Sequence, residues 1–136
     1  YALLSALAGV PIDQAIAVTG SVNQKGRIQP IGGVCHKIEG FYEVCRARGL
    51  TGRQGVLLPR QNVAHIVLKP EVEAAIVDGR FHLYAASTID EGIEILTGVA
   101  AGAADAKGAY PEGTVNARAM ARLAEMNELL RRRPAP

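Results

Sequence analysis

The sequence predicts an α+β fold, in which a small mixed β-sheet packs with helices. Three observations predict it. Short apolar runs with β-strand character lie at residues 15–22, 27–31, 55–59 and 81–86. Segments with helical character lie at residues 34–48, 71–77 and 89–96. The two kinds of segment intermix without strict strand–helix–strand alternation, which favours a mixed sheet.

Composition limits the class of protein. The chain of 136 residues is long enough for one hydrophobic core. Hydrophobic residues make up 49% of it and charged residues 21%, which is ordinary for a globular domain. The formal net charge of +2 gives no general electrostatic reason to expect a nucleic acid or a membrane surface as partner. No apolar run approaches the roughly 18 residues that a membrane-spanning helix needs.

The first residues, YALLSALAGVP, are apolar from the start and lack the basic beginning of a signal peptide. We expect a helix over residues 1–8, and its uncapped start predicts a fragment whose first helix has lost residues. Further along, residues 23–26 supply turn chemistry between two apolar runs. They predict a β-hairpin that joins residues 15–22 to residues 27–31.

Two polar residues are expected to cap helices. Asn62 precedes a short helical segment over residues 63–68, and its side chain is of the type that caps helix starts. Thr88 precedes the helix over residues 89–96, with Glu91 three residues later. This spacing predicts a capping box.

The chain is expected to have three parts. Residues 1–98 contain all the predicted strands, and residues 99–113 form an Ala/Gly-rich, mobile connector. Residues 114–136 form a C-terminal helical extension, capped by Thr114. Its apolar residues recur at helical spacing: Met120, Leu123, Met126, Leu129 and Leu130. The arginines at 131–133 are interpreted as a solvated helix end rather than a nucleic-acid-binding patch.

Cys35 and Cys45 are the two cysteines of the chain. On one helix they would lie about 15 Å apart along its axis, too far for a disulfide. Two unpaired thiols suit a reducing compartment, which predicts a cytoplasmic protein. The three histidines, His36, His65 and His82, are scattered, and no metal site is expected because no cluster has zinc-ligand spacing.

Lys37 lies among apolar residues of the helix over residues 34–48. On a helical wheel that starts at Val34 it falls at about 300°, between Val44 and Phe41. Two interpretations are open: its stem packs while its amine reaches water, or burial and the nearby positive end of the helix dipole keep the amine neutral. A neutral amine can take a proton from a nucleophile, as a general base does.

Thr19 ends an apolar run just before Gly20. Its hydroxyl can hydrogen-bond a neighbouring amine, or it can be an ordinary strand residue bonded to backbone. The serines at 5, 21 and 87 lie in no Gly-x-Ser-x-Gly or Ser-x-x-Lys pattern. The residues therefore indicate a possible base without a convincing nucleophile.

Several motifs together resemble the Lon protease C-terminal proteolytic domain, over roughly residues 1–98. They are Ala17-Val18-Thr19-Gly20, Lys25-Gly26-Arg27-Ile28, Pro30-Ile31-Gly32-Gly33 with Lys37 after a three-residue gap, Pro59 followed by Asn62, and a helix carrying Asp90, Glu91, Gly92 and Leu96. The tail around residues 110–114 looks like the extension of a bacterial Lon-related subgroup. The resemblance implies part of a ribosomal protein S5 domain 2-like architecture.

The resemblance also implies a function, that of an ATP-dependent serine peptidase with a Ser-Lys dyad that degrades cytosolic proteins. Lys37 matches the dyad lysine, and Thr19 matches the threonine that supports it. Members of this family assemble as hexameric rings, and an ATPase module of the same polypeptide binds ATP with Mg. No cofactor is expected in the proteolytic domain itself. Protein or peptide substrates are the expected partners; membrane and nucleic acid are not.

The family's nucleophilic serine lies in a small-residue loop just before the first helix, which would place it upstream of Tyr1. Ser5 is inside the apolar helix and does not match it. We therefore expect this fragment to be inactive alone. Two alternatives are a non-proteolytic Lon-like domain, used for assembly or DNA contact in recombination or competence ATPases, and a pure interaction module of ribosomal-protein-like fold.

Overall fold

The computed structural model describes residues 1–132. The described residues form two compact units: residues 13–92 make up the larger one, and residues 1–12 with residues 93–132 make up the smaller one. Within the described residues, no helix combines the length and the apolar character needed to traverse a lipid bilayer.

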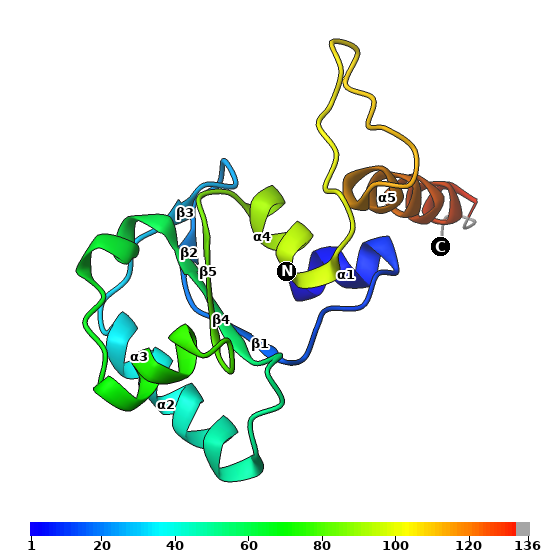
Figure 1. Ribbon diagram of the computed structural model, residues 1–136. Helices are drawn as coiled ribbons and strands as arrows, with labels where there is room; N and C mark the ends of the chain where they lie inside the picture. The colour runs from blue at the N-terminus through cyan, green and yellow to red at the C-terminus, as the bar shows by residue number, and fades with distance from the viewer. Residues whose placement is uncertain (133–136) are drawn as a thin grey trace. The chain divides into compact units, whose positions relative to one another are not determined.

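A three-stranded parallel sheet lies at the centre of the larger unit (Figure 1). Its strands, in spatial order, are β1 (Ile16–Val18), β4 (Gly55–Pro59) and β5 (His82–Ala86). Helix α2 (Val34–Arg48) leads from β1 back to β4. The 3-10 helix η1 (Arg60–His65) and helix α3 (Pro70–Val77) lead from β4 to β5. The predicted α+β class and the helix over residues 34–48 are confirmed.

A β-hairpin follows β1, as predicted, but its first strand is shorter than expected. Strand β2 (Ser21–Val22) pairs antiparallel with β3 (Ile28–Gln29). The predicted single run over residues 15–22 is divided at residues 19–20, and its first half joins the parallel sheet instead. The last backbone bond of this run to β4 is the one from the N–H of Thr19 to the carbonyl of Leu57, at 2.9 Å. From Ser21 onward the chain pairs with β3 instead.

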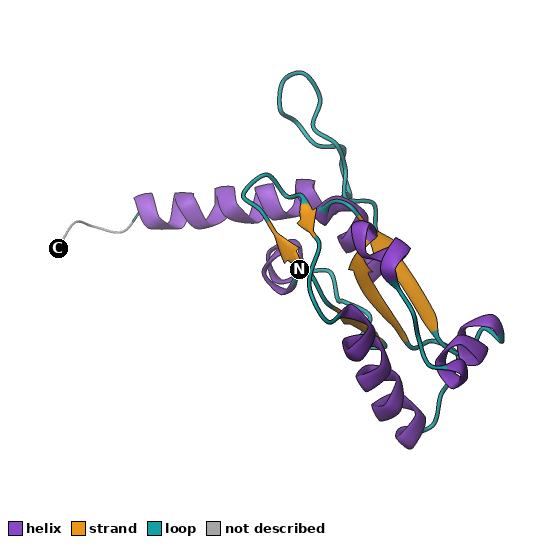
Figure 2. Ribbon diagram, turned by 90° about the vertical axis from the view of Figure 1, so that its left-hand side faces the viewer, coloured by secondary structure: helices purple, strands orange, loops and turns teal. Residues whose placement is uncertain are grey.

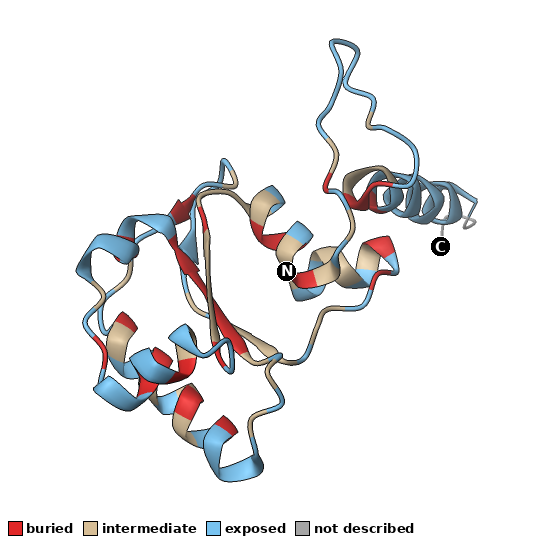
Figure 3. Cartoon of the chain, in the orientation of Figure 1, coloured by how far each residue is buried: buried red, intermediate tan, exposed pale blue. Residues whose placement is uncertain are grey.

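The core of the larger unit lies between the sheet and its two crossover helices. Val56 and Leu58 alternate along β4 and so point to the same face of the sheet. There they pack with residues of α2, α3 and the segment before β5: Val34, Ile38, Tyr42, Val72, Ala75 and Phe81. The rings of Tyr42 and Phe81 meet edge to face, with centroids 5.4 Å apart. Figure 3 shows the resulting buried stripe along β4.

Helix α4 (Ile89–Thr97) begins as predicted at Thr88, whose hydroxyl accepts a hydrogen bond from the N–H of Glu91 at 3.2 Å. The predicted capping box differs in one partner. The Glu91 carboxylate accepts from the N–H of Ser87 at 2.9 Å rather than from Thr88. The side chain reaches one residue further back, and so ties the end of β5 to the helix.

In the smaller unit, helix α1 (Ala2–Ala8) packs against helix α5 (Val115–Arg131). Their shared core consists of Ala8, Val10, Ile93, Ala101, Val115 and Ala119. The hydroxyl of Thr114 accepts from the N–H of Ala117 at 3.3 Å, which confirms the predicted cap. Apart from the turns of α5 next to α1, the helix is exposed along its length (Figure 3).

A long loop joins α4 to α5 and contains neither helix nor strand over residues 98–114, all of which the structure describes (Figure 2). Its first part is held by backbone bonds, because the carbonyls of Ala100 and Ala101 accept from the first residues of α5. The carboxylate of Asp105 accepts from the N–H groups of Lys107 and Ala109 and closes the loop tip as a turn. The division into parts 1–98, 99–113 and 114–136, and the mobility of the connector, stay predictions.

Candidate active site

The carboxyl ends of β1, β4 and β5 meet at one edge of the sheet, because the three strands are parallel. Open parallel sheets bind ligands outside this edge. Thr19 follows β1 there, η1 follows β4 and Ser87 follows β5. Helix α2 also starts on this side, since it must run back to reach the amino end of β4. The topology therefore gathers the predicted site residues at the carboxyl edge.

Thr19 is partly exposed and is fixed by its backbone. Its N–H extends the β1–β4 ladder by one bond, to Leu57. Directly after it the chain turns into the hairpin at Gly20, where an added Cβ would lie 3.5 Å from the ring of Pro59. Thr19 is thus the last residue held in the sheet before the chain leaves it.

Lys37 lies in the first turn of α2, and its N–H donates to the carbonyl of Gly33 at 3.2 Å. Gly33 itself takes the left-handed conformation, with φ of 67°, and so directs the chain into the helix. Lys37 itself is exposed, whereas Phe41, one turn further along the same side of the helix, is half-buried.

Of the two interpretations left open for Lys37, the structure agrees with the one in which the side chain reaches water, because Lys37 is exposed. The buried face of α2 follows Val34, Ile38, Tyr42 and Cys45, and Lys37 lies beside it rather than on it. Val44, which made that side of the wheel look apolar, is itself 51% exposed. The apolar pattern of a helix shows which residues can be buried. Which of them are buried depends on how much of the helix surface the neighbouring elements cover.

Asn62 is buried, with 7% exposure, inside η1. The expectation that it caps a helix over residues 63–68 is wrong, because the 3-10 helix already begins at Arg60. Its carboxamide instead bonds both backbone groups of Ile31: Oδ1 accepts from the N–H at 3.0 Å, and Nδ2 donates to the carbonyl at 2.9 Å. The sequence analysis noted Asn62 as part of the motif in which it follows Pro59. No pattern near Asn62 in the sequence indicates that its side chain bonds the backbone of Ile31.

Arg60, at the start of η1, joins the ends of β4 and β5. Its guanidinium donates to the Ser87 hydroxyl at 3.1 Å, to the Ala85 carbonyl at 2.9 Å and to the Glu91 carboxylate at 3.3 Å. The pKa of Glu91 is lowered, mainly by the hydrogen bond from the N–H of Ser87; burial, the next largest effect, opposes this, and the hydrogen bond and charge of Arg60 lower the pKa further.

The serines of the chain are engaged elsewhere. Ser5 Oγ donates to the carbonyl of Val10 at 2.5 Å, and Ser21 Oγ donates to Gln29 at 3.1 Å. The hydroxyl of Ser87 accepts from Arg60. Each hydroxyl has a structural partner, and none of these bonds involves Lys37.

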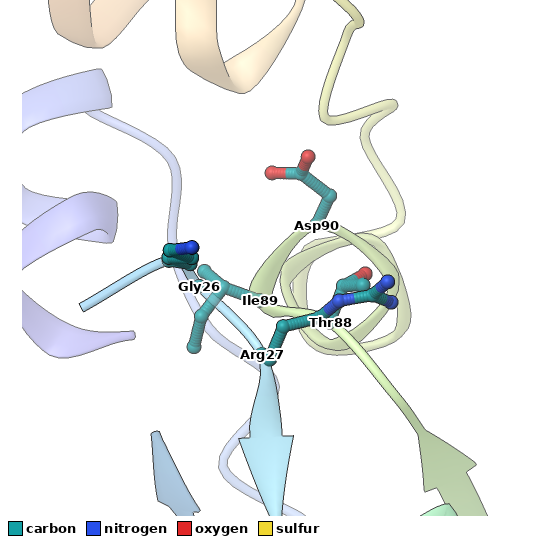
Figure 4. Close-up of a pocket in the computed structure, with 6 residues that line it drawn as sticks. Gly26, Arg27, Thr88, Ile89 and Asp90 are labelled. Carbon is teal, nitrogen blue, oxygen red and sulfur yellow. The ribbon is translucent and has the colours of Figure 1, made fainter. Parts of the chain in front are cut away.

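A shallow cavity of about 160 Å³ lies where the β2–β3 turn meets the start of α4 (Figure 4). It is lined by Lys25, Gly26, Arg27, Thr88, Ile89 and Asp90. The N–H of Ile89 donates to the carbonyl of Gly26 at 2.9 Å, and Arg27 forms a bridge with Thr88. Figure 4 shows Arg27 extending alongside Thr88, while the Asp90 carboxylate points away from it. These backbone contacts beside the cavity join the hairpin to the start of α4.

Thiols, imidazoles and carboxylates do not gather for metal binding in the part of the chain that the structure describes, where no group of three or more could hold an ion. Cys35 Sγ lies 3.9 Å from the carbonyl of His65, and Cys45 is buried. Burial raises the pKa of the Cys45 thiol, which keeps it in the unreactive thiol form.

Comparison with known proteins gives a consistent result. The family model described as the Lon protease (S16) C-terminal proteolytic domain matches residues 1–98. The chain is 48% identical over 95 residues to a putative Lon protease homolog of Escherichia coli, a match that covers 70% of this chain and 16% of the relative. For a putative Lon protease homolog of Haemophilus influenzae the identity is 44% over 96 residues, which covers 71% and 16%. An archaeal Lon protease of Archaeoglobus fulgidus is 34% identical over 93 residues, which covers 68% and 13%. The chain thus spans a minor part of the length of these relatives.

Proposed function

This chain belongs to the Lon protease C-terminal proteolytic domain family, and from that premise we propose that the longer protein is an ATP-dependent serine endopeptidase. In this proposal Lys37 is the general base of a Ser-Lys dyad, and Thr19 supports its amine. The protein degrades other proteins in the cytoplasm as a hexameric ring. An ATPase module outside this chain binds ATP with Mg and delivers unfolded substrate.

The observation that carries the proposal is the order of the elements: β1 ends just before Thr19 at the carboxyl edge of the sheet, and the helix that carries Lys37 runs from that side back to β4. Thr19 is held by its backbone bond to Leu57, and Lys37 lies in the first turn of α2, directly after the glycine turn at Gly33. The exposure of Lys37 leaves its side chain within reach of a nucleophile from outside the described residues, and in this proposal the surroundings that keep its amine unprotonated are supplied by other parts of the longer protein. A base must reach the proton that it takes, and accessibility is the first requirement.

The chemistry follows from this arrangement. The unprotonated amine of Lys37 takes the proton of a serine hydroxyl as its oxygen attacks the carbonyl carbon of a peptide bond. The resulting ammonium then gives a proton to the departing amine, which leaves an acyl-enzyme. Water repeats the cycle: it loses a proton to Lys37, attacks the ester and releases the acid with the serine restored. Backbone N–H groups near the serine stabilise the oxyanion.

The nucleophile in this proposal is a serine outside the 136 residues. The hydroxyls of Ser5, Ser21 and Ser87 have structural partners in the described chain. Supplying the base alone, the chain is expected to hydrolyse no peptide bonds by itself.

The proposal is tested by ATP-stimulated casein degradation by the full-length protein and its Lys37→Ala variant. Loss of the base is expected to reduce the rate by at least about 100-fold, since general-base catalysis contributes that much. Lys107→Ala, which removes a lysine from the exposed loop before α5, is the matched control and is expected to keep wild-type activity. Full activity of Lys37→Ala would contradict the proposal and favour a non-proteolytic role in assembly or DNA contact.

A further inference from the structure

We propose that Asn62 is a positioning residue for the catalytic base: its buried carboxamide fixes Ile31, and thereby fixes where α2 begins and where Lys37 lies. The inference rests on the proposed role of Lys37 as the base. It gives Asn62 a function without contact to the substrate, because it acts through the backbone.

The Asn62–Ile31 contact has two bonds of opposite direction. One carboxamide oxygen accepts from the N–H of Ile31, and the carboxamide nitrogen donates to its carbonyl. This pairing permits one orientation of the amide, because a flipped amide would place donor against donor and acceptor against acceptor. The side chain therefore serves as a strand-like partner for a residue that lies outside the sheet.

The contact lies close to the base along the chain. Ile31 is followed by Gly32 and Gly33, and the carbonyl of Gly33 accepts from the N–H of Lys37. The start of α2, which the structure describes fully, has no side-chain cap. The bonds to Ile31 hold the chain two residues before Gly33, at the entry to this uncapped first turn.

Asn62 has a rigid support of its own. It lies in η1, which directly follows the fully buried Pro59 of β4. At the start of η1, Arg60 is bonded to the end of β5 and to α4. Asn62 thus connects the base-carrying helix to the ends of two strands. Catalytic groups depend on such supporting contacts, and a displacement of about 1 Å can reduce a rate roughly 100-fold.

The first test is Asn62→Ala in the full-length protein, measured as hydrolysis of a fluorogenic peptide with saturating ATP. We expect kcat to fall by about 10- to 100-fold, while KM stays within about 2-fold because the substrate contacts are unchanged. The matched control is His82→Ala. His82 Nε2 lies 2.7 Å from the carbonyl oxygen of Gly52, which is also a side-chain bond to a distant backbone group, but at the amino edge of the sheet. This control is expected to lower the melting temperature and leave kcat within about 2-fold.

The second test is Asn62→Asp, in which the new side chain has nearly the same volume as the old one, so no cavity is created. When protonated, the introduced carboxyl group can accept from Ile31 N–H and donate to its carbonyl, as the amide does. When ionised, it can only accept, and its charge faces the Ile31 carbonyl oxygen. The ratio of variant to wild-type kcat is therefore expected to decline as pH rises through the pKa of the introduced group, over pH 5 to 9. The same ratio for His82→Ala should be flat.

The outcomes separate the positioning role from the proposed function. If Lys37→Ala is inactive while Asn62→Ala keeps kcat within about 2-fold, or while Asn62→Asp keeps wild-type kcat at every pH, Asn62 has no positioning role and the dyad lysine stands. If Lys37→Ala keeps full activity, the proposed function fails whatever Asn62 does. If Asn62→Ala does not fold, the pH dependence of the folded Asn62→Asp protein decides.

Discussion

Arg60 Nη2 lies 3.3 Å from Glu91 Oε2, and this ion pair joins the turn after β4 to the first turn of α4. The same carboxylate oxygen accepts from the N–H of Ser87 at 2.9 Å. The ionised form of Glu91 therefore holds together two of the segments that leave the carboxyl edge of the sheet. Its protonation state should affect the stability of that edge.

Glu91→Gln is expected to make the chain less stable near neutral pH and equally stable in acid. The folded-state pKa of Glu91 is lowered by Ser87 and Arg60, so its ionised form adds stability above the unfolded value of about 4.3. That stability is lost as pH falls through the lower folded-state pKa. Both side chains of the pair are largely exposed, so the difference at pH 7 should be below about 1 kcal/mol.

Urea unfolding of both proteins between pH 2.5 and 7 measures this difference. Asp13, whose pKa is lowered by the N–H of Ala15 and then by Arg53, titrates in both proteins and cancels. A difference in unfolding free energy that does not shrink towards acid would show that the Glu91 charge contributes nothing.

Gly33→Ala tests the turn that leads into α2. Gly33 has a φ of 67°, a conformation that costs an L-residue about 1 kcal/mol or more. The substitution should reduce the unfolding free energy by that amount, although no atom lies within 4 Å of the added Cβ. Gly32→Ala is the control: its site is equally open and has no positive φ, so its effect should be within about 0.5 kcal/mol. Chemical denaturation of both variants would contradict the prediction if the two losses were equal.

Gly55→Ala is expected to destabilise the sheet by overpacking. An added Cβ would lie 2.7 Å from the carbonyl oxygen of His82 and 2.8 Å from the Tyr84 ring, which belong to the neighbouring strand. Because backbone cannot move aside without breaking the β4–β5 ladder, we expect a loss of about 1–3 kcal/mol. Thermal and urea unfolding measure it.

Gly40→Ala provides the opposite outcome with the same change of residue. Gly40 lies inside α2, is exposed, and has nothing within 4 Å of an added Cβ. Alanine should stabilise the helix by up to about 1 kcal/mol. Destabilisation by both substitutions would mean that the added methyl group, rather than its surroundings, decides the effect.

Local patterns were sufficient for most elements of the fold. The helix over residues 34–48 and the strand over residues 55–59 were predicted with the bounds that the structure has. Both are long or apolar enough to have one consistent interpretation, and glycines mark their ends. The run over residues 15–22 was harder, because its two halves pair with different partners and strand pairing depends on distant residues.

The candidate site was less predictable than the fold. The family resemblance identified Thr19 and Lys37, but the helical wheel placed Lys37 among apolar residues and left open whether its side chain is buried, and the structure shows that it is exposed. A helical wheel gives the angular position of each side chain around the helix, but it does not show which neighbouring elements cover that side chain. For the same reason the partner of Asn62, Ile31, was out of reach, since the two residues are 31 positions apart.

The outer part of α5 should contribute little to the stability of this chain. Its apolar residues between Met120 and Leu130 are 41% to 67% exposed, whereas Val115 at the start of the helix is fully buried against the core with α1. Leu123→Ala should therefore change the unfolding free energy by less than about 0.5 kcal/mol. Val115→Ala removes two buried methyl groups and should cost about 1–2 kcal/mol, at roughly 0.8 kcal/mol for each buried group. Urea unfolding of the chain in dilute solution measures both effects. A loss for Leu123→Ala as large as that for Val115→Ala would show that the outer turns of α5 are covered in solution.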